Sequence, residues 1–357
     1  METTPSNVYQ TVHLDQDALA QKAYDLYGTY YPEICRGYSA YQRSRTLEDF
    51  KLHIRYIQES LAVGDPAILI DYAGWAQVLL TSLGLPKDCL SSSLAVLQEV
   101  LHKELSPEMS RKTDAYITAS IRFLETAPTE VPSFIETDNP RKELAISYLD
   151  ALLAAQREKA IALIMDSVEN GVSVRDLYLH VFQPVLCEVG KLWQMQMISV
   201  AQEHYVTAAT QLTLAQLYPR FMTESRKRER RGKMLVAACV SDELHEMGIR
   251  MVSDFFEMDG WNTYYIGANT PAEGLVSAVR ERRADVVALS STMSFHLPLM
   301  DHLIRSLRSS QDTQQVTIIV GGYPFNIIPD LWKKVGADAY AENADEAVAI
   351  ANRFVGL

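Results

Sequence analysis

The C-terminal part of this chain alternates short apolar runs with amphipathic stretches of helical length, and few folds accept that pattern. The run Lys233–Val240 is almost continuously apolar, which is typical of a strand buried on both faces of a parallel sheet. Strands that alternate with helices predict a doubly wound parallel sheet. The other predicted strands are Thr263–Ile266, Val286–Ser290, Thr317–Val320 and Ala339–Ala341, and the predicted helices are Ile249–Met258, Pro271–Arg283, Leu297–Ser309 and Ile328–Val335.

A histidine lies in the loop after the first strand, where open α/β sheets bind their ligands. His245 stands in the segment 243–248, with the sequence ELHEMG. Forty-one residues (249–289) separate this segment from the SST at 290–292, and 28 residues (293–320) separate that from the GG at 321–322. A lone histidine after a strand is more often a capping or packed residue, so the inference depends on three elements in register.

This series resembles the pattern of cobalamin-binding domains: an acid-x-His-x-x-Gly loop, then Ser-x-Leu or Ser-x-Thr, then Gly-Gly. The resemblance implies a Rossmann-like domain in which the neutral imidazole of His245 is the lower axial ligand of cobalt. It also implies that Glu243 accepts a hydrogen bond from the other ring nitrogen. The family usually carries Asp there, and Asp242 is adjacent, so either carboxylate could contact the imidazole. The other residues implied to contact the corrin or its nucleotide tail are Leu244, Gly248, Ser290, Thr292, Gly321 and Gly322.

Four amphipathic segments precede the sheet region, at about 141–155, 157–169, 174–195 and 199–222. Gly171 and the expected N-cap Ser173 separate the second from the third. The segment resembles the four-helix-bundle cap that covers cobalamin in methyltransferases and in light-responsive cobalamin repressors. Its stretch WQMQMISVAQEH at 193–204 resembles the photoreceptor signature, a Trp, a Val seven residues on, then Glu-His.

That resemblance implies that Trp193 and Val200 pack on an upper 5′-deoxyadenosyl group. It also implies that Glu203 and His204 form hydrogen bonds to this group or lie beside it. The alternative is an ordinary bundle, with Trp193 and Val200 in its core and Glu203-His204 on a solvated face.

One position departs from the photoreceptor pattern. The repressors carry a His directly after the Trp, which ligates cobalt after light has cleaved the cobalt–carbon bond, whereas this chain has Gln194. An amide is a poor ligand for cobalt(III). Water or another imidazole would take its place, with His204 the nearest in sequence and His180 and His296 dependent on the fold.

The N-terminal part is predicted to be all helical, with helices punctuated by the turns Gly64-Asp65-Pro66 and Gly84-Leu85-Pro86. It faintly resembles globin-like and phycobilin-type sensor domains. Beside a photoreceptor-like cap, this resemblance suggests the photocobilin subfamily, which binds biliverdin as well as cobalamin. The predicted helices are Gln16–Tyr31, Leu47–Ala62, Pro66–Leu83, Lys87–Glu104 and Pro107–Thr126, and the residue types of a bilin site are His53, Arg55 and Tyr56, with Tyr72 and Trp75 near them in sequence. The alternative is that the aromatic residues among them are core.

The 357 residues are too many for one core, so we expect three domains: 1–132 helical, 133–228 the cap and 229–357 the cobalamin domain. A net charge of −12 argues against nucleic-acid binding, and the one basic run, 226–233, is expected to be a solvated linker. Four cysteines without close pairing favour a reducing cytoplasm over a disulfide framework or a zinc site. No apolar run of membrane-spanning length and no signal peptide are evident.

Three functions compete. The main prediction is a non-enzymatic light sensor, in which photolysis of adenosylcobalamin changes domain or subunit contacts, with biliverdin as a second chromophore. Its output would pass through a light-dependent homo-oligomer or an unknown effector protein. The alternative is a corrinoid carrier that moves methyl groups in a cobalamin-dependent methyltransferase system, and the third is a helical interaction protein with structural cobalamin. Trp193 with Glu203-His204 favours the first.

Overall fold

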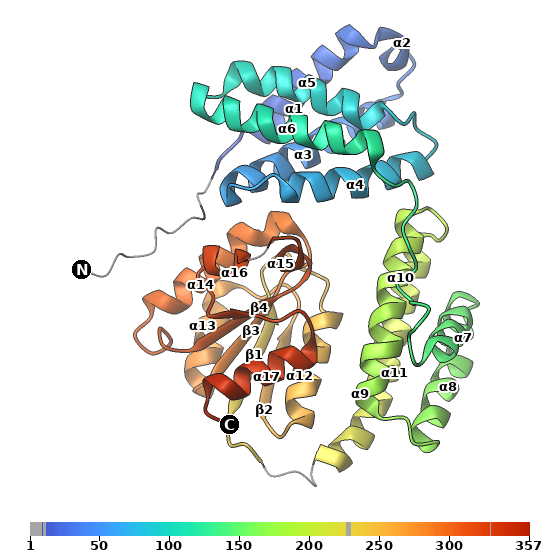
Figure 1. Cartoon of the computed structure of the whole chain (residues 1–357), viewed down its shortest axis with the longest axis vertical. Coiled ribbons are helices and arrows are strands. Elements are labelled where there is room, and N and C mark those ends of the chain that lie inside the picture. The colour runs from blue at the N-terminus through green and yellow to red at the C-terminus, as the bar shows by residue number, and fades with distance from the viewer. Residues whose placement is uncertain (1–8, 10–11, 226–229, 329) are drawn as a thin grey trace.

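The computed structural model describes residue 9 and residues 12–225, 230–328 and 330–357. Residues 226–229 of the basic run, and with them the predicted boundary at 228/229, lie outside the described residues. The first group of helices, the N-terminal layer, comprises α1 (Gln16–Tyr30), α2 (Pro32–Cys35), α3 (Ala40–Val63), α4 (Ala67–Ser82), α5 (Cys89–Glu104) and α6 (Pro107–Thr126). These helices pack together and lie over the rest of the described residues, with α3 and α4 nearest to them (Figure 1).

Local signals explain where these helices begin and end. The helix α3 begins seven residues earlier than predicted, at residue 40 instead of 47, because Ser39 and Gln42 form a capping box. It ends at Gly64, whose φ of 76° is the left-handed conformation that favours glycine. Ser106 caps α6 through the backbone N–H of Met109.

The second group of helices lies beside the sheet domain and below the N-terminal layer (Figure 1). One predicted helix, 174–195, is broken by a π-helical turn. Pro184 has no N–H to give to the carbonyl of His180, and that carbonyl accepts instead from Asn139 Nδ2 at 2.9 Å. The group comprises α7 (Lys142–Leu153), α8 (Arg157–Glu169), α9 (Val174–Leu177), the π-helix η1 (Tyr178–Phe182), α10 (Gln183–Gln194) and α11 (Val200–Ser225).

The C-terminal part is a five-stranded, wholly parallel sheet in the order β2-β1-β3-β4-β5, which confirms the predicted parallel α/β architecture. The strands are β1 (Met234–Cys239), β2 (Asn262–Gly267), β3 (Val286–Ser290), β4 (Thr317–Gly321) and β5 (Ala339–Tyr340). The helices are α12 (Met247–Met258), α13 (Ala272–Arg282), the short 3-10 helix η2 (Ser294–His296), α14 (Leu297–Ser309), α15 (Tyr323–Ile327), α16 (Leu331–Lys334) and α17 (Ala344–Phe354). The predicted helix Ile328–Val335 is therefore wrong in its bounds, because Ile328 is extended and Asp330 has a φ of 66°.

Alternate residues of β1 supply two different cores. Val236, Ala238 and Val240 face α13 and α14, whereas Leu235 and Ala237 pack toward α12, α17 and the second helical group. The strand is buried on both faces, which explains its unbroken apolar run.

The N-terminal helices dock on both other parts of the molecule. Tyr323 donates a hydrogen bond to Asp71 at 2.8 Å, and Lys334 donates to the carbonyl of Val63 at 2.9 Å. Gln194, at the end of α10, donates to the carbonyl of Trp75 in α4 at 2.9 Å. The N-terminal layer thus lies across the carboxyl end of the sheet and the end of α10 (Figure 1).

The helical N-terminal part is confirmed, while its globin-like character and the four-helix-bundle form of the second group stay predictions. Among the described residues, no helix is long and apolar enough to cross a membrane.

Candidate functional site

The register of the sheet brings the three predicted motif elements together. Cys239 at the end of β1 lies opposite Ser290 at the end of β3, and Ser290 lies opposite Gly321 at the end of β4. The strand order reverses between β1 and β3, and the crevice at such a reversal is where open α/β sheets bind ligands. The loop with His245 leaves β1 at this point.

Glu243 is the buried centre of the site, with a fully inaccessible side chain. Its Oε1 accepts from His245 twice, from Nδ1 at 2.5 Å and from the backbone N–H at 3.0 Å. Its Oε2 accepts from the loop after β3, from the backbone N–H groups of Thr292 at 2.7 Å and Met293 at 3.1 Å and from Nδ1 of His296 at 3.1 Å. One carboxylate therefore ties the loop after β1 to the loop after β3.

These donors set the charge of Glu243. Burial raises the pKa of Glu243, but hydrogen bonds from the His245 and His296 rings and from the backbone of His245 and Met293 together hold it well below its usual range. The hydrogen bond that His245 donates to Glu243 raises the pKa of His245, while burial lowers it, and the negative charges of Glu243 and Glu203 raise it further. In the structure Glu243, and not Asp242, contacts the imidazole.

His245 presents the rest of its ring outward. Its side chain is 60% exposed, and Nε2 makes no hydrogen bond to any residue in the described ranges. Because ionised Glu243 only accepts, Nδ1 carries the hydrogen and Nε2 of the neutral ring keeps a free lone pair. Leu244 beside it is 71% exposed, so an apolar side chain borders the imidazole at the surface. This donor set fits a metal that needs one protein imidazole and an apolar surface around it.

Glu246 joins the site to the second helical group, and the sequence prediction missed this role. Its Oε1 accepts from Gln211 of α11 at 3.0 Å, and its Oε2 accepts from the Tyr265 hydroxyl at 2.9 Å and the Ala268 N–H at 3.1 Å. The position of Glu246 in the sequence motif does not indicate this role, because Gln211 is 35 residues away in sequence and comes close to Glu246 only when the chain folds.

The glycines after β4 are required by the backbone of the neighbouring loop. A Cβ on Gly322, whose φ is 103°, would stand 2.0 Å from the carbonyl oxygen of Ser291. A Cβ on Gly321 would stand 3.2 Å from the carbonyl oxygen of Ala341. A Cβ on Gly248 would meet nothing within 4 Å, so the first turn of α12 borders open space. Ser290 is buried and Thr292 half-buried beside it.

One face of α11 turns toward this site. Val200, Glu203, Thr207 and Gln211 share that face, since successive helix residues are about 100° apart, and Gln211 reaches Glu246. Val200 is 53% exposed, so it is not bundle core. Glu203 bonds Nδ1 of His204 at 2.5 Å and accepts from Thr207 at 3.1 Å.

The remaining cap positions lie at the interface with the N-terminal helices. Trp193 packs near Trp75 of α4, with ring centroids 6.3 Å apart. The neighbouring Gln194 is buried and uses its amide to hold α4. From the sequence, two further histidines are candidate cobalt ligands in place of Gln194. The ring of His296 is hydrogen-bonded to the buried Glu243, and the backbone carbonyl of His180 accepts a hydrogen bond from Asn139.

The predicted bilin residues cluster, but they pack on one another. His53 is buried and its Nδ1 lies 2.7 Å from the Tyr72 hydroxyl, while burial lowers the pKa of His53 to about 4. Tyr56 stacks on Tyr72 with centroids 3.8 Å apart. Arg55 is exposed and donates to Gln16. Binding of a tetrapyrrole between these rings would require them to separate.

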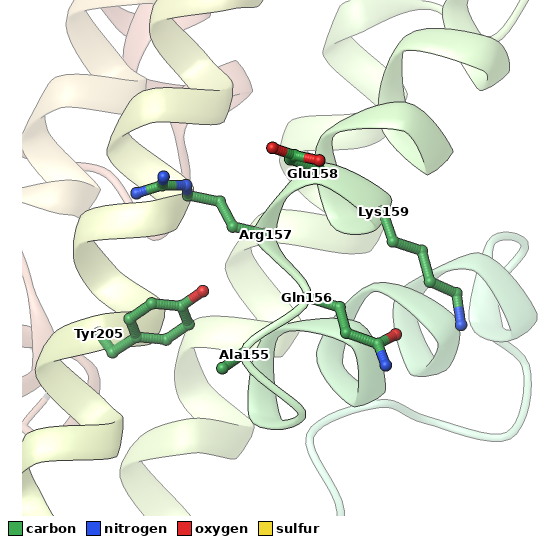
Figure 2. Close-up of a pocket in the computed structure, with 6 residues that line it drawn as sticks. All are labelled: Ala155, Gln156, Arg157, Glu158, Lys159 and Tyr205. Carbon is green, nitrogen blue, oxygen red and sulfur yellow. The ribbon is translucent and has the colours of Figure 1, made fainter.

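A surface pocket lies between α11 and the N-terminal end of α8 (Figure 2). Its volume is about 500 Å³, and it is lined by residues 155–159, which form the end of the α7–α8 turn and the start of α8, and by Tyr205. Tyr205 stands two residues from both Glu203 and Thr207, which places it about 200° around the helix from them. The pocket is therefore separate from the His245 site. Within the described ranges, no group of three or more His, Cys, Asp or Glu residues could hold a bare metal ion.

Three protein-family profiles match this chain. The B12 binding domain profile matches residues 234–349, and a second B12 binding domain profile matches residues 145–218. The phycobilisome protein profile matches residues 6–124.

Curated relatives agree with the first two profiles. Dimethylamine corrinoid protein 1 of Methanosarcina acetivorans is 25% identical over 217 residues, 60% of this chain and 99% of that protein. Dimethylamine corrinoid protein 3 of Methanosarcina mazei is 31% identical over 123 residues, 34% of this chain and 72% of that protein. The solved monomethylamine corrinoid protein of Methanosarcina barkeri covers 60% of this chain and 99% of its own, with 19% identity and a TM-score of 0.53, and shows the fold alone.

The main functional prediction from the sequence is wrong. The sequence predicts a light sensor from Trp193 with Glu203-His204, yet the curated relatives that this chain matches include several dimethylamine corrinoid proteins. They favour the alternative, a corrinoid methyl carrier. Trp193 and Val200 stand on different helices, α10 and α11. The motif misled because the helical cap resembles those of methyltransferases as well as those of light-responsive repressors.

Proposed function

This chain belongs to the family of cobalamin-binding corrinoid proteins, and from that premise we propose that it carries methyl groups for a cobalamin-dependent methyltransferase. The chain itself is not an enzyme, because its relatives are corrinoid proteins. The observation that carries the proposal is the match across nearly the whole length of a dimethylamine corrinoid protein. Cobalt in the bound corrinoid supplies a centre that accepts a methyl group and gives it up again.

His245 is proposed as the lower ligand of cobalt, through Nε2. Glu243 holds the ring in the required tautomer and strengthens it as a donor. The exposed Leu244 and the open space at Gly248 leave room for the corrin face. Ser290, Thr292, Gly321 and Gly322 are proposed to border the nucleotide tail, in the crevice between the ends of β1, β3 and β4.

Trp193, Val200, Glu203 and His204 are proposed to cover the upper face of the corrin. The exposure of Val200 and the direction of the α11 face support this role. Methyl is the upper group that a carrier requires, and the adenosyl form stays a prediction from the cap motif. The division into 1–132, 133–228 and 229–357, a homo-oligomeric state and a cytoplasmic location likewise stay predictions.

The lower ligand is tested by the spectrum of bound cobalamin. His245→Ala should remove the axial nitrogen signal from cob(II)alamin and weaken cobalamin binding by about tenfold to a hundredfold. His302→Ala, a change at an exposed histidine on α14, is the matched control and should leave both unchanged. An unaltered signal in His245→Ala would contradict the ligand assignment.

Methyl transfer is tested separately. The chain loaded with cob(I)alamin is mixed with mono-, di- or trimethylamine and a methyltransferase specific for each. Formation of methylcobalamin, followed by absorbance, should occur with at least one pair. The carrier function would be contradicted if methyl iodide methylated the bound cobalamin but none of the methyltransferases did so.

A second candidate function concerns the N-terminal helices, which we propose to bind a linear tetrapyrrole, biliverdin. The match of residues 6–124 to the phycobilisome protein profile favours it. Arg55 would pair with a propionate, and His53 and Tyr56 would contact the rings once the Tyr56–Tyr72 stack opens. Titration with micromolar biliverdin, with Arg55→Gln as the variant, should give binding that the variant weakens. No uptake by the unaltered chain would contradict this candidate.

A further inference from the structure

The N-terminal helices contact the loop after β3, whose residues donate hydrogen bonds to Glu243. Phe295 stands in that loop, within η2, and Tyr56 of α3 meets its ring edge-on with centroids 5.8 Å apart. The Arg55 guanidinium lies 5.7 Å from the centre of the same ring. Phe295 in turn packs edge-on against His296 at 4.7 Å. The loop after β3 is thus fixed to α3 by one aromatic side chain.

That loop supplies three of the five hydrogen bonds that Glu243 accepts. The donors are the backbone of Thr292 and Met293 and the ring of His296. The remaining two come from His245 itself. A shift of the loop would therefore move Glu243, and Glu243 orients His245.

The far side of the contact is rigid. Tyr56 is buried and stacks on Tyr72, and Tyr72 is bonded to the buried His53. Tyr72 also stacks near Trp75, which packs against Trp193 of the second helical group. The N-terminal helices consequently touch both the loop after β3 and the C-terminal end of α10.

We propose that the N-terminal helices position the lower ligand of cobalt, with Phe295 and His296 as the positioning residues that act through Glu243 on His245. The inference rests on the proposed role of His245. In this chain the strength of the axial bond then depends on how α3 seats Phe295, so a ligand or partner that moves α3 changes the cobalt centre.

The test uses the full chain loaded with cob(II)alamin, whose electron paramagnetic resonance spectrum shows splitting by an axial nitrogen. Phe295→Ala should shift the ratio of His-on to His-off cobalt toward His-off by about tenfold, the size of typical effects around metal ligands. Phe295→Leu keeps an apolar contact and should shift it less. His296→Leu should act like Phe295→Ala, and His296→Gln, which can still donate to Glu243, should restore most of the signal.

The matched control is Tyr323→Phe. It removes the hydrogen bond to Asp71 in the same domain interface but leaves Phe295 in place. This variant should keep the His-on ratio of the unaltered chain. An equal shift in Tyr323→Phe would overturn the route through Phe295, because general loosening of the interface would then explain the result.

A cofactor-free measurement completes the test. Hydrogen exchange at the amides of Thr292 and Met293 should become faster in Phe295→Ala, since both amides bond Glu243. The inference would be overturned if a folded Phe295→Ala chain showed unchanged hydrogen exchange and an unchanged His-on ratio. In that case His245→Ala would still remove the nitrogen splitting, so the proposed ligand would stand. If His245→Ala kept the splitting, the proposed ligand itself would fail, and this inference with it.

Discussion

The site contains two histidine–glutamate pairs that look alike in sequence and in contact. His245 bonds Glu243 and His204 bonds Glu203, each from Nδ1 at 2.5 Å. Glu243 is fully buried and holds five hydrogen bonds, whereas the Glu203 side chain is 30% exposed and accepts from one other residue, Thr207. His204 is 75% exposed and His245 is 60% exposed.

The difference shows that the contact itself does not define a ligand site. A carboxylate orients an imidazole only when something else fixes the carboxylate. Glu243 is fixed by two loops, so His245 has one available orientation. Glu203 stands on the surface of a helix, so its pair with His204 can rearrange at little cost.

The largest expected effect is that of Glu243→Gln in the cobalamin-free chain. The amide would point its N–H₂ group at donors on one side or the other and leave buried N–H groups unpaired. We expect the free energy of unfolding to fall by about 4 kcal/mol. Glu203→Gln is the control and should change it by less than about 0.5 kcal/mol. Urea unfolding measures both, and similar values for the two variants would remove the distinction between the pairs.

Gly322→Ala tests whether the close approach of the two loops sets the shape of the site. A Cβ there would stand 2.0 Å from the Ser291 carbonyl oxygen and require a left-handed backbone. We expect a loss of about 3 kcal/mol in the free energy of unfolding from strain and overpacking together. Gly248→Ala, where a Cβ meets nothing within 4 Å, is the matched control and should be stable. Equal unfolding midpoints would contradict the tight approach.

The centre of the sheet could be predicted from the sequence because β1 and β3 are buried on both faces and therefore almost wholly apolar. The His245 loop could be placed because it follows such a strand. The role of His296 could not be predicted, because it contacts Glu243 from 53 residues away. The docking of Tyr56 on Phe295 depends likewise on how separate folded parts meet, and neither residue carries a pattern for it.

The π-helix at Tyr178–Phe182 was missed for a local reason. A periodic amphipathic pattern predicts one continuous helix, and the interruption arises from Pro184 together with the distant Asn139. The light-sensing prediction failed for a different reason, since a helical cap of this kind resembles those of methyltransferases as well as those of light-responsive repressors.

Another buried glutamate, Glu59, extends the comparison. Glu59 is 2% exposed, and its Oε2 accepts from Tyr9 at 2.7 Å. Burial raises the pKa of Glu59 to about 7, and hydrogen bonds from Tyr9 and Gln58 offset only part of that effect. Burial alone would raise the pKa of Glu243 as well as that of Glu59. The number of hydrogen-bond donors therefore decides which of the two carboxylates is charged.

The folded-state pKa of Glu59, about 7, exceeds its ordinary value of 4.5, so its stabilising contribution is complete below pH 4.5 and is lost as the pH rises through 7. We expect the unaltered chain to lose on the order of 3 kcal/mol relative to Glu59→Gln across that range. Urea unfolding of both chains from pH 4.5 to 8 measures it. A constant difference between them would show that Glu59 does not titrate in that range.

The smallest expected effect separates the two histidines directly. His245→Ala in the cobalamin-free chain removes one donor from Glu243 but leaves four, so the cost should be about 1 kcal/mol, reduced because the ring is half exposed. His204→Ala removes a partner from a carboxylate that water already reaches, and the free energy of unfolding should stay within about 0.5 kcal/mol. Adding 1 M salt should leave the His245→Ala cost in place, because a buried carboxylate is screened poorly. A cost for His204→Ala equal to that for His245→Ala would mean that the cap holds Glu203 as firmly as the sheet holds Glu243.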